Sequence, residues 1–226
     1  DDSFTVRLDS ADAGIISFTG VCDFTGSNFL NAFTHASVEQ STNSETALRR
    51  ISVEEGDLTL IANRGPVATT MAGHGVSIAG TVITTGGGDI LINGRGGDGA
   101  TGRNGILITG SAWGSGGISS TSVAGGAGTI TLIGTGGPFA STNNSAYGIC
   151  LTGTTAGVSS TLGDIVLTGT SDSTGSGSNN HGIYITSGAH VRATGTVAAV
   201  NITLNGNSAV ASAASGSNYG VHLNGA

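Results

Sequence analysis

The chain has no lysine, and only 9% of its 226 residues are charged, far below the quarter that is usual in globular domains. Ten of its fourteen acidic residues lie within residues 1–57. Residues 58–226 therefore hold four acids and four arginines and carry no net charge. A protein that binds a phosphate backbone concentrates positive charge on one surface. The absence of such a cluster argues against nucleic acid as a partner.

Other residue types are also scarce. Aromatic residues make up 4% of the chain while 37% is hydrophobic, so we expect a narrow core of stacked aliphatic side chains. No run of about 18 apolar residues occurs, which argues against a membrane-spanning helix. The two cysteines, Cys22 and Cys150, permit at most one disulfide, and we interpret both as free thiols.

Glycine, in contrast, is abundant, with 41 residues that lack the every-third spacing of collagen. Many of the glycines bracket a recurring phrase that alternates apolar and polar residues, of which Gly163-Asp164-Ile165-Val166-Leu167-Thr168-Gly169 is one copy. A second phrase, such as Gly105-Ile106-Leu107-Ile108-Thr109-Gly110, follows each first phrase, and a weaker third one, such as Val158-Ser159-Ser160-Thr161, comes after it. Alternation with period two is typical of β-strands.

The first phrase begins at positions 57, 89, 129, 164 and 201, which are 32, 40, 35 and 37 residues apart. Three strands per repeat predict an all-β solenoid of about five coils with three faces. A coil of about 18 residues with one phrase each is the alternative. We prefer the larger coil because Asp, Thr or Asn precedes the first phrase and Gly precedes the second. The inward ladders expected from stacking are Ile90, Ile130, Ile165 and Ile202 in one face, and Ile106, Ile149, Ile183 and Val221 in another.

Residues 1–55 do not follow the repeat, and they hold five of the six phenylalanines. We predict strands at residues 4–8 and 14–18, and a short helix or an irregular loop at residues 28–40. A solenoid needs an atypical segment over its open end. We therefore interpret residues 1–55 as an N-terminal cap, with a docking or adhesive segment and a piece of a preceding domain as alternatives, and residues 56–226 as the β-solenoid repeats.

The two phrases resemble the repeats of large bacterial exoproteins of the filamentous-haemagglutinin and autotransporter kind. The resemblance covers residues 56–226 and rests on the patterns Gly-Asp-Ile-x-Leu-x-Gly and Gly-Ile-x-Ile-x-Gly. It implies a right-handed parallel β-helix, and a location outside a bacterial cell or on its surface. Proteins of this kind mostly serve as stalks, adhesins or scaffolds.

Three aspartates, Asp57, Asp89 and Asp164, open first phrases and would form a file along the stack. A file of carboxylates could bind calcium, which needs several oxygen ligands. Thr129 and Asn201 interrupt the file in the other repeats, however. Asp, Asn and Thr also bond local backbone at turns, and we favour that role, so we predict no metal site and no cofactor.

The histidines give no metal motif either. His74 and His181 stand just before the glycine of a second phrase, where other repeats have Asn104, Tyr147 and Tyr219. A position filled by His, Asn or Tyr is typical of a polar residue at the start of a strand. The other histidines are His35, His190 and His222.

Many β-helices cleave polysaccharides with clustered carboxylates, or with an acid beside a basic group. Asp98 shares a loop with Arg95 and Arg103, whereas Asp172 stands alone among serines. We therefore propose no catalytic residues and predict that the chain is not an enzyme. An ice-binding face would need regular Thr-x-Thr rows, and Thr129-Ile130-Thr131 is an isolated instance.

Outward positions include Leu91 and Val166 in the first phrase. In the second phrase they are Ser77, Leu107, Cys150, Tyr184 and His222. Leucine and valine on an outward face suggest a surface that contacts something else. The sequence stops at Asn224-Gly225-Ala226 within a coil, and an uncovered coil is a β edge that another strand can join. We therefore expect an extracellular structural or adhesive fibre component that associates head-to-tail. A partner could also be a cell-surface glycan or protein. The alternatives are a carbohydrate-active or glycan-binding β-helix and a stalk fragment of a giant adhesin.

Overall fold

The structure is a computed structural model of the chain. It describes residues 14–18, 21–27, 36–40, 50–55, 57–62, 73–79, 81–84, 88–97, 104–110, 116–121, 128–138, 145–172, 178–195, 199–208 and 217–225. All of the regular secondary structure in this part of the chain is β-strand. The strands are β1 (Gly14–Phe18), β2 (Val21–Ser27), β3 (Ala36–Gln40), β4 (Arg50–Glu55), β5 (Leu58–Ala62), β6 (Val76–Ile78), β7 (Thr81–Thr84), β8 (Ile90–Arg95), β9 (Ile106–Thr109), β10 (Gly116–Ser120), β11 (Ile130–Thr135), β12 (Ile149–Thr152), β13 (Ala156–Ser160), β14 (Ile165–Ser171), β15 (Ile183–Thr186), β16 (His190–Ala193), β17 (Ile202–Ser208) and β18 (Val221–Asn224).

The strands form three parallel sheets, which we name A, B and C. Sheet A contains β1, β3, β6, β9, β12, β15 and β18, sheet B contains β2, β4, β7, β10, β13 and β16, and sheet C contains β5, β8, β11, β14 and β17. From β5 onward the chain gives one strand to sheet C, one to sheet A and one to sheet B, and then returns to sheet C. We use the word repeat for one such series.

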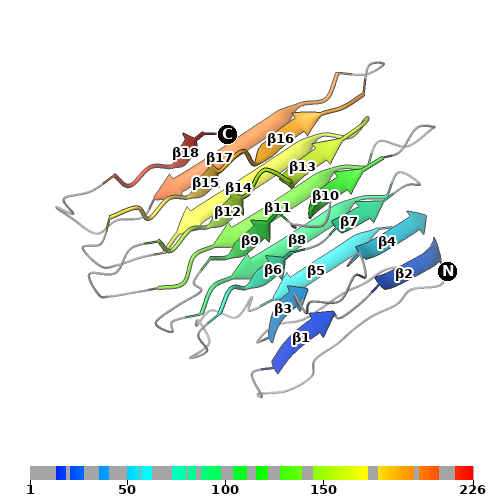
Figure 1. Ribbon diagram of the computed structural model, residues 1–226, viewed down its shortest axis with the longest axis horizontal. Coiled ribbons are helices and arrows are strands. Elements are labelled where there is room, and N and C mark those ends of the chain that lie inside the picture. Colours follow the sequence, from blue (N-terminus) through cyan, green and yellow to red (C-terminus); the bar gives the residue numbers. More distant parts are fainter. Residues whose placement is uncertain are drawn as a thin grey trace.

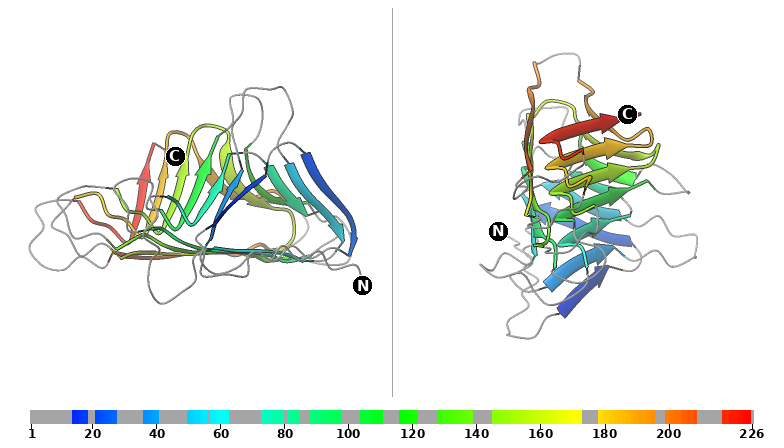
Figure 2. Two further views of the ribbon diagram at one scale, coloured as in Figure 1. Left: turned by 90° about the horizontal axis from the view of Figure 1, so that it is seen from below. Right: turned by 90° about the vertical axis from the view of Figure 1, so that its left-hand side faces the viewer.

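Successive repeats lie side by side, so the colours in Figure 1 run from blue at one end of the stack to red at the other. Figure 2 shows the three sheets around a common interior. The prediction of an all-β chain with stacked parallel strands is confirmed, and the arrangement is consistent with a β-helix.

The pairing register confirms both predicted aliphatic ladders. In sheet C, Ile90 pairs with Ile130, which pairs with Ile165, and Ile165 pairs with Ile202. In sheet A the pairs run from Ile106 through Ile149 and Ile183 to Val221. First phrases pair only with first phrases, and second phrases pair with one another in a different sheet. The alternative coil of about 18 residues is therefore wrong.

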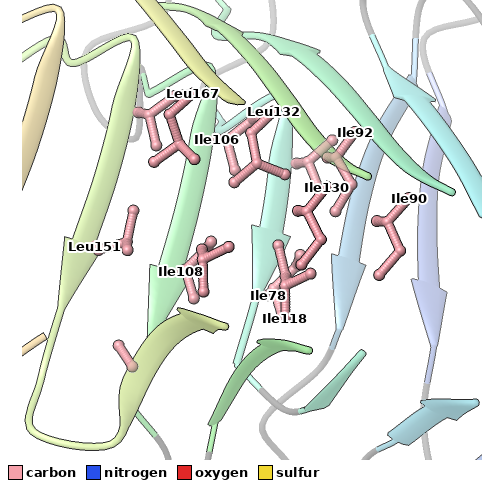
Figure 3. Packing of buried hydrophobic residues seen from close by; sticks show 14 of the residues in the cluster. Ile78, Ile90, Ile92, Ile106, Ile108, Ile118, Ile130, Leu132, Leu151 and Leu167 are labelled. Atoms are coloured by element: carbon pink, nitrogen blue, oxygen red, sulfur yellow. The ribbon is translucent and has the colours of Figure 1, made fainter. Parts of the chain in front are cut away.

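The core consists of aliphatic side chains contributed by all three sheets. Ile130 and Leu132 of sheet C, Ile149 of sheet A and Val158 of sheet B are all fully buried. Figure 3 shows part of this cluster, with Ile130 and Leu132 among the isoleucine and leucine side chains that lie between the strands. Full burial of one such side chain stabilises the fold by about 1.5–3 kcal/mol relative to leaving it exposed. A narrow core can therefore be stable because every repeat adds several of these residues.

The described part of residues 1–55 belongs to the same sheets as the repeats. β3 pairs with β6 through Val38 and Val76, and β4 pairs with β7 through Ile51 and Val82. The predicted strand at residues 14–18 is confirmed as β1, but residues 36–40 form a strand where we predicted a helix or a loop. Residues 4–8 lie outside the described residues. The sheets thus continue across residue 55, and the role of residues 1–55 as a cap or docking segment stays a prediction.

Glycines line the junction where each strand of sheet C passes the next strand of sheet A. The alternation that turns Ile130 and Leu132 inward also turns Gly134 inward. A Cβ on Gly134 would meet the backbone carbonyl oxygen of Gly148, so only glycine allows the two chain segments to approach this closely. The same contact gives a physical reason for Gly94, Gly169 and Gly206 in three other repeats, whereas Ala62 occupies this register position in β5.

The core is uncovered at β17 and β18, the outermost strands of sheets C and A. Ile202 is 42% exposed and Leu223 is 58% exposed, whereas Ile165, the partner of Ile202 in the preceding repeat, is fully buried. Both residues occupy core positions in the register. Core-type side chains therefore face solvent at this end of the described stack.

We predict that Gly134→Ala lowers the free energy of unfolding by about 1–3 kcal/mol, because the added methyl group meets backbone that cannot move without displacing a strand. Urea denaturation measures this difference. Thr131→Ala is the matched control, since Thr131 lies on the outward face of the same strand and is expected to change stability by about 0.5 kcal/mol or less. Equal stability of the two variants would contradict the close approach at Gly134.

Candidate functional site

The predicted file of aspartates lies at the start of the sheet C strands and joins one repeat to the next. The Asp57 Oδ1 accepts the backbone N–H of Asp89 at 2.8 Å. In the same way, the Asp89 Oδ1 accepts the N–H of Thr129 at 2.7 Å, and the Asp164 Oδ1 accepts the N–H of Asn201 at 2.8 Å. We predicted bonds to local backbone, and this was wrong. Stacking in register places the same position of the next repeat directly above each carboxylate.

These bonds account for the chemistry of the file. The backbone and side-chain N–H groups of Asn201 hold the pKa of Asp164 below its usual value. One oxygen of each of these carboxylates accepts a backbone N–H of the next repeat. The file is therefore a seam, meaning a row of hydrogen bonds that joins neighbouring repeats. Among the described residues, no group of three or more His, Cys, Asp or Glu side chains is placed to hold a metal ion.

A second seam lies at the residue just before the glycine of each second phrase, which we name the pre-glycine position. His74 Nδ1 accepts the N–H of Asn104 at 3.3 Å, and Asn104 Oδ1 accepts the N–H of Tyr147 at 3.1 Å. His181 Nδ1 accepts the N–H of Tyr219 at 3.1 Å. His74 and His181 therefore have the same role as Asn104: each side chain accepts a backbone N–H from the next repeat.

The residue before the pre-glycine position adds a third set of bonds, which we did not predict. The Asn180 Oδ1 accepts the N–H of Ala146 at 3.1 Å, and the Asn218 Oδ1 accepts the N–H of Asn180 at 2.8 Å. Asn180 is fully buried. The signal in the sequence was the pair Asn-His at 180–181 and its counterpart Asn-Tyr at 218–219.

Burial sets the protonation of the two histidines in this seam. It lowers the pKa of His74 to about 4, and it is also the larger cause that lowers the pKa of His181 to about 4, with His222 as the smaller cause. An unperturbed histidine has a pKa of about 6.5. Both rings are therefore neutral at physiological pH and act as hydrogen-bond acceptors.

All three tyrosines of the chain gather around His181. The ring of Tyr147 stacks on that of His181 with centroids 5.5 Å apart, and Tyr219 stacks on the opposite side at 5.5 Å. Tyr184 and His222 complete the group, at 5.2 and 4.5 Å from His181. We name these five residues the aromatic cluster. Sequence reasoning placed their positions in two separate rows and did not bring them together.

The outward row of sheet A contributes to this cluster. Leu107, Cys150, Tyr184 and His222 stand in register on β9, β12, β15 and β18, as the spacing predicted. Cys150 is a free thiol that is only 5% exposed, and burial raises its pKa to about 12. A buried, neutral thiol is a packing residue and not a nucleophile. The side chain of Cys22 lies outside the described residues.

Within the part of the chain that the structure describes, one ion pair joins repeats at the junction of sheets C and A. The Arg95 Nη2 lies 2.8 Å from the Asp172 Oδ2, although the two residues are 77 positions apart. In the sequence Asp172 stands alone among serines, and the structure brings Arg95 of a distant repeat to it. Asp98 and Arg103, the other candidates for acid–base chemistry, lie outside the described residues. A part-exposed ion pair of this kind contributes modestly to stability.

Taken together, the described surface offers aromatic rings, amides and hydroxyl groups in register, with little charge. The aromatic cluster is one place where such side chains gather, and within it Tyr219 is 47% exposed. Tyrosine rings with polar neighbours can pack on the apolar faces of a ligand and hydrogen-bond at the same time.

Comparisons of the chain with protein-family models, with curated proteins and with solved structures find no match. The described part of the chain contains no helix with the length and hydropathy that crossing a membrane requires.

We predict that the free energy of unfolding falls as the pH is lowered from about 6.5 to about 4. In this range unfolded histidines take up protons, whereas His74 and His181 stay neutral in the folded state because burial lowers their pKa to about 4. Chemical denaturation at several pH values measures the change.

The matched variant for this prediction is His74→Asn, because Asn104 fills the equivalent position and accepts the equivalent backbone N–H. This variant should lose less stability than the wild type between neutral pH and pH 4. If both proteins lose the same amount, His74 does not contribute to the pH dependence.

Proposed function

We propose that the chain is a section of a right-handed parallel β-helix, with about five coils in residues 56–226, that serves as a structural or adhesive component outside a bacterial cell. The observation that carries this proposal is the uncovered core at β17 and β18, where Ile202 and Leu223 are exposed at core positions. The handedness and the location come from the resemblance of the repeated phrases to large exoproteins.

The uncovered end favours association through β-strands. The outer edges of β17 and β18 present backbone N–H and C=O groups in the spacing of a parallel ladder. A further strand that pairs there in the same register would bury Ile202 and Leu223 as Ile165 and Ile185 are buried within the stack. Such a strand can come from a continuation of the same chain or from another copy. In the second case head-to-tail contacts produce an open filament.

The described side chains support a non-catalytic role. Side-chain acceptor atoms bind the backbone N–H groups of the next repeat in two places. They belong to the aspartates at the start of the sheet C strands and to the histidines at the pre-glycine position. Asp172 is held in an ion pair with Arg95. We therefore propose a scaffold whose polar residues join repeats, with self-association or a cell-surface glycan or protein as its partner and no role for nucleic acid.

Electron microscopy of the purified protein at several concentrations, with sedimentation alongside, tests the head-to-tail association. We expect threads that lengthen with concentration. Leu223→Lys should shorten or abolish them, because it places a charge where the next coil must pack. Thr131→Lys is the matched control, since Thr131 lies on the outward face in the middle of the stack, and it should leave the threads intact. Compact particles at every wild-type concentration would contradict the association.

The aromatic cluster favours a second candidate, a glycan-binding β-helix. Three tyrosines within one cluster, in a chain that has no others, provide a platform for the apolar face of a neutral sugar. Binding on a glycan array that is lost in Tyr184→Ala and kept in Thr131→Ala would support this function. Depolymerisation of an acidic polysaccharide that requires Asp98 or Asp172 would instead support a carbohydrate-active enzyme.

A further inference from the structure

Two histidine rings on adjacent repeats form a hydrogen-bonded pair. The Nε2 atom of His181 lies 2.9 Å from the Nδ1 atom of His222. On the other side of the same ring, the Nδ1 atom of His181 accepts the backbone N–H of Tyr219 at 3.1 Å. A backbone N–H can only donate, so this second bond decides which nitrogen of His181 carries the proton.

The bonds fix the tautomer of both rings. Because Nδ1 of His181 is an acceptor, the neutral ring carries its proton on Nε2. That Nε2–H donates to Nδ1 of His222, so the proton of His222 lies on its own Nε2. The chain of bonds runs in one direction, from Tyr219 through His181 to His222. A metal ion on Nε2 of His181 would need the proton on Nδ1, where the Tyr219 N–H points, so the pair is not a preformed metal site.

An added proton removes one of the two hydrogen bonds. If it binds Nδ1 of His181, this new N–H faces the N–H of Tyr219. If it binds Nδ1 of His222, two N–H groups face each other across the gap of 2.9 Å. His181 can relieve that contact only by moving its own proton to Nδ1, which again faces Tyr219. No placement of protons keeps both bonds once the pair is charged.

The surroundings do not stabilise the charged form. His181 is 1% exposed, and burial is the main cause that lowers its pKa, followed by the charge of His222. Burial raises the pKa of the Cys150 thiol to about 12 and raises the pKa of Tyr147 above its usual value, so neither group carries a charge between pH 4 and 8 that could stabilise a charged pair. The titratable side chains that face the pair, or stand beside the residues that do, are Tyr147 before β12, Cys150 on β12, Tyr184 on β15 and Tyr219 before β18.

We propose that the His181–His222 pair is a proton-sensitive latch, which holds the segment from Tyr219 through β18 on the stack when it is neutral and loosens it when it is charged. Among the described strands, β18 pairs with β15 alone in sheet A, so the pair of histidines adds to a contact made through one neighbouring strand. The backbone bonds from Gly182 to Tyr219 and from Ile183 to Gly220 remain. The change is therefore a local loosening of one edge, and it does not depend on the proposed structural role.

Hydrogen exchange of single backbone amides, followed by NMR between pH 7.5 and pH 4, tests the latch in the wild-type protein. With the intrinsic exchange rate at each pH divided out, the protection of the Tyr219 amide should fall about tenfold or more as the pair becomes charged. The Tyr147 amide is the internal control, because it donates to Asn104 Oδ1, which does not titrate. Protection of Tyr219 that stays constant, or that falls in step with Tyr147, would overturn the proposal.

The variant His181→Asn keeps a hydrogen-bond acceptor at position 181 but removes the ring that can take up a proton. Asn104 accepts the equivalent backbone N–H, that of Tyr147, through its side-chain oxygen. The variant should therefore keep the Tyr219 amide protected and make its protection independent of pH. His190→Asn, a change on β16 outside the pair, should keep the wild-type response. A fall in Tyr219 protection that persists in His181→Asn would refute the latch.

A further measurement needs only the wild-type protein, so it tests the proposal even if the variants do not fold. Long-range ¹H–¹⁵N spectra of the imidazole rings at pH 7.5 report which nitrogen carries the proton. We expect the Nε2–H tautomer for both His181 and His222, and an Nδ1–H tautomer for His181 would overturn the proposal.

Discussion

Every repeat of this chain must supply acceptors for the backbone N–H groups that point along the stack toward its neighbour. Within the strands, the carbonyl groups of the adjacent parallel strand do this. Where the strands begin, side chains take over: Asp89 accepts the N–H of Thr129, Asn104 that of Tyr147 and His181 that of Tyr219. A buried N–H without an acceptor is unfavourable. Asp89, Asn104 and His181 are different residue types, but they share one chemical property, a side-chain acceptor atom that reaches the backbone of the next repeat.

The same stacking dictates the apolar and glycine patterns. Residues in register form continuous columns, so one isoleucine that faces inward requires another above and below it, as Ile130 is flanked by Ile90 and Ile165. Where sheets C and A approach each other, Gly134 and Gly148 leave room for backbone alone. The core cluster of the described residues consists of aliphatic side chains. The tyrosines accordingly lie outside it, around His181, where they give the surface its one described concentration of aromatic side chains.

These seams bear on function because the same kind of hydrogen bond joins one repeat to the next along the stack. Each repeat can be added to the stack with the same bonds as the last, which suits a scaffold or a filament. The edge strand β18 is an exception to this uniformity, since a pair of histidines holds the segment before it where other repeats use one acceptor. A solvent-facing edge and a titratable contact at the same place would allow the environment to influence what joins there.

Much of the fold could be predicted from the sequence, because strand alternation and glycine spacing are local and repeat. They identified the aliphatic ladders, the three strands per repeat and the outward row of Leu107, Cys150 and Tyr184. The position of His181 at the start of a strand was also visible, but not its bond to a backbone one repeat away. Such contacts depend on which residues of distant segments stand opposite each other in the sheets. Because the loops between the strands vary in length, this register cannot be deduced from the sequence. For the same reason only the tertiary structure joined Arg95 to Asp172, gathered the tyrosines around His181 and extended the sheets into β1–β4, whose sequences do not carry the repeated phrases.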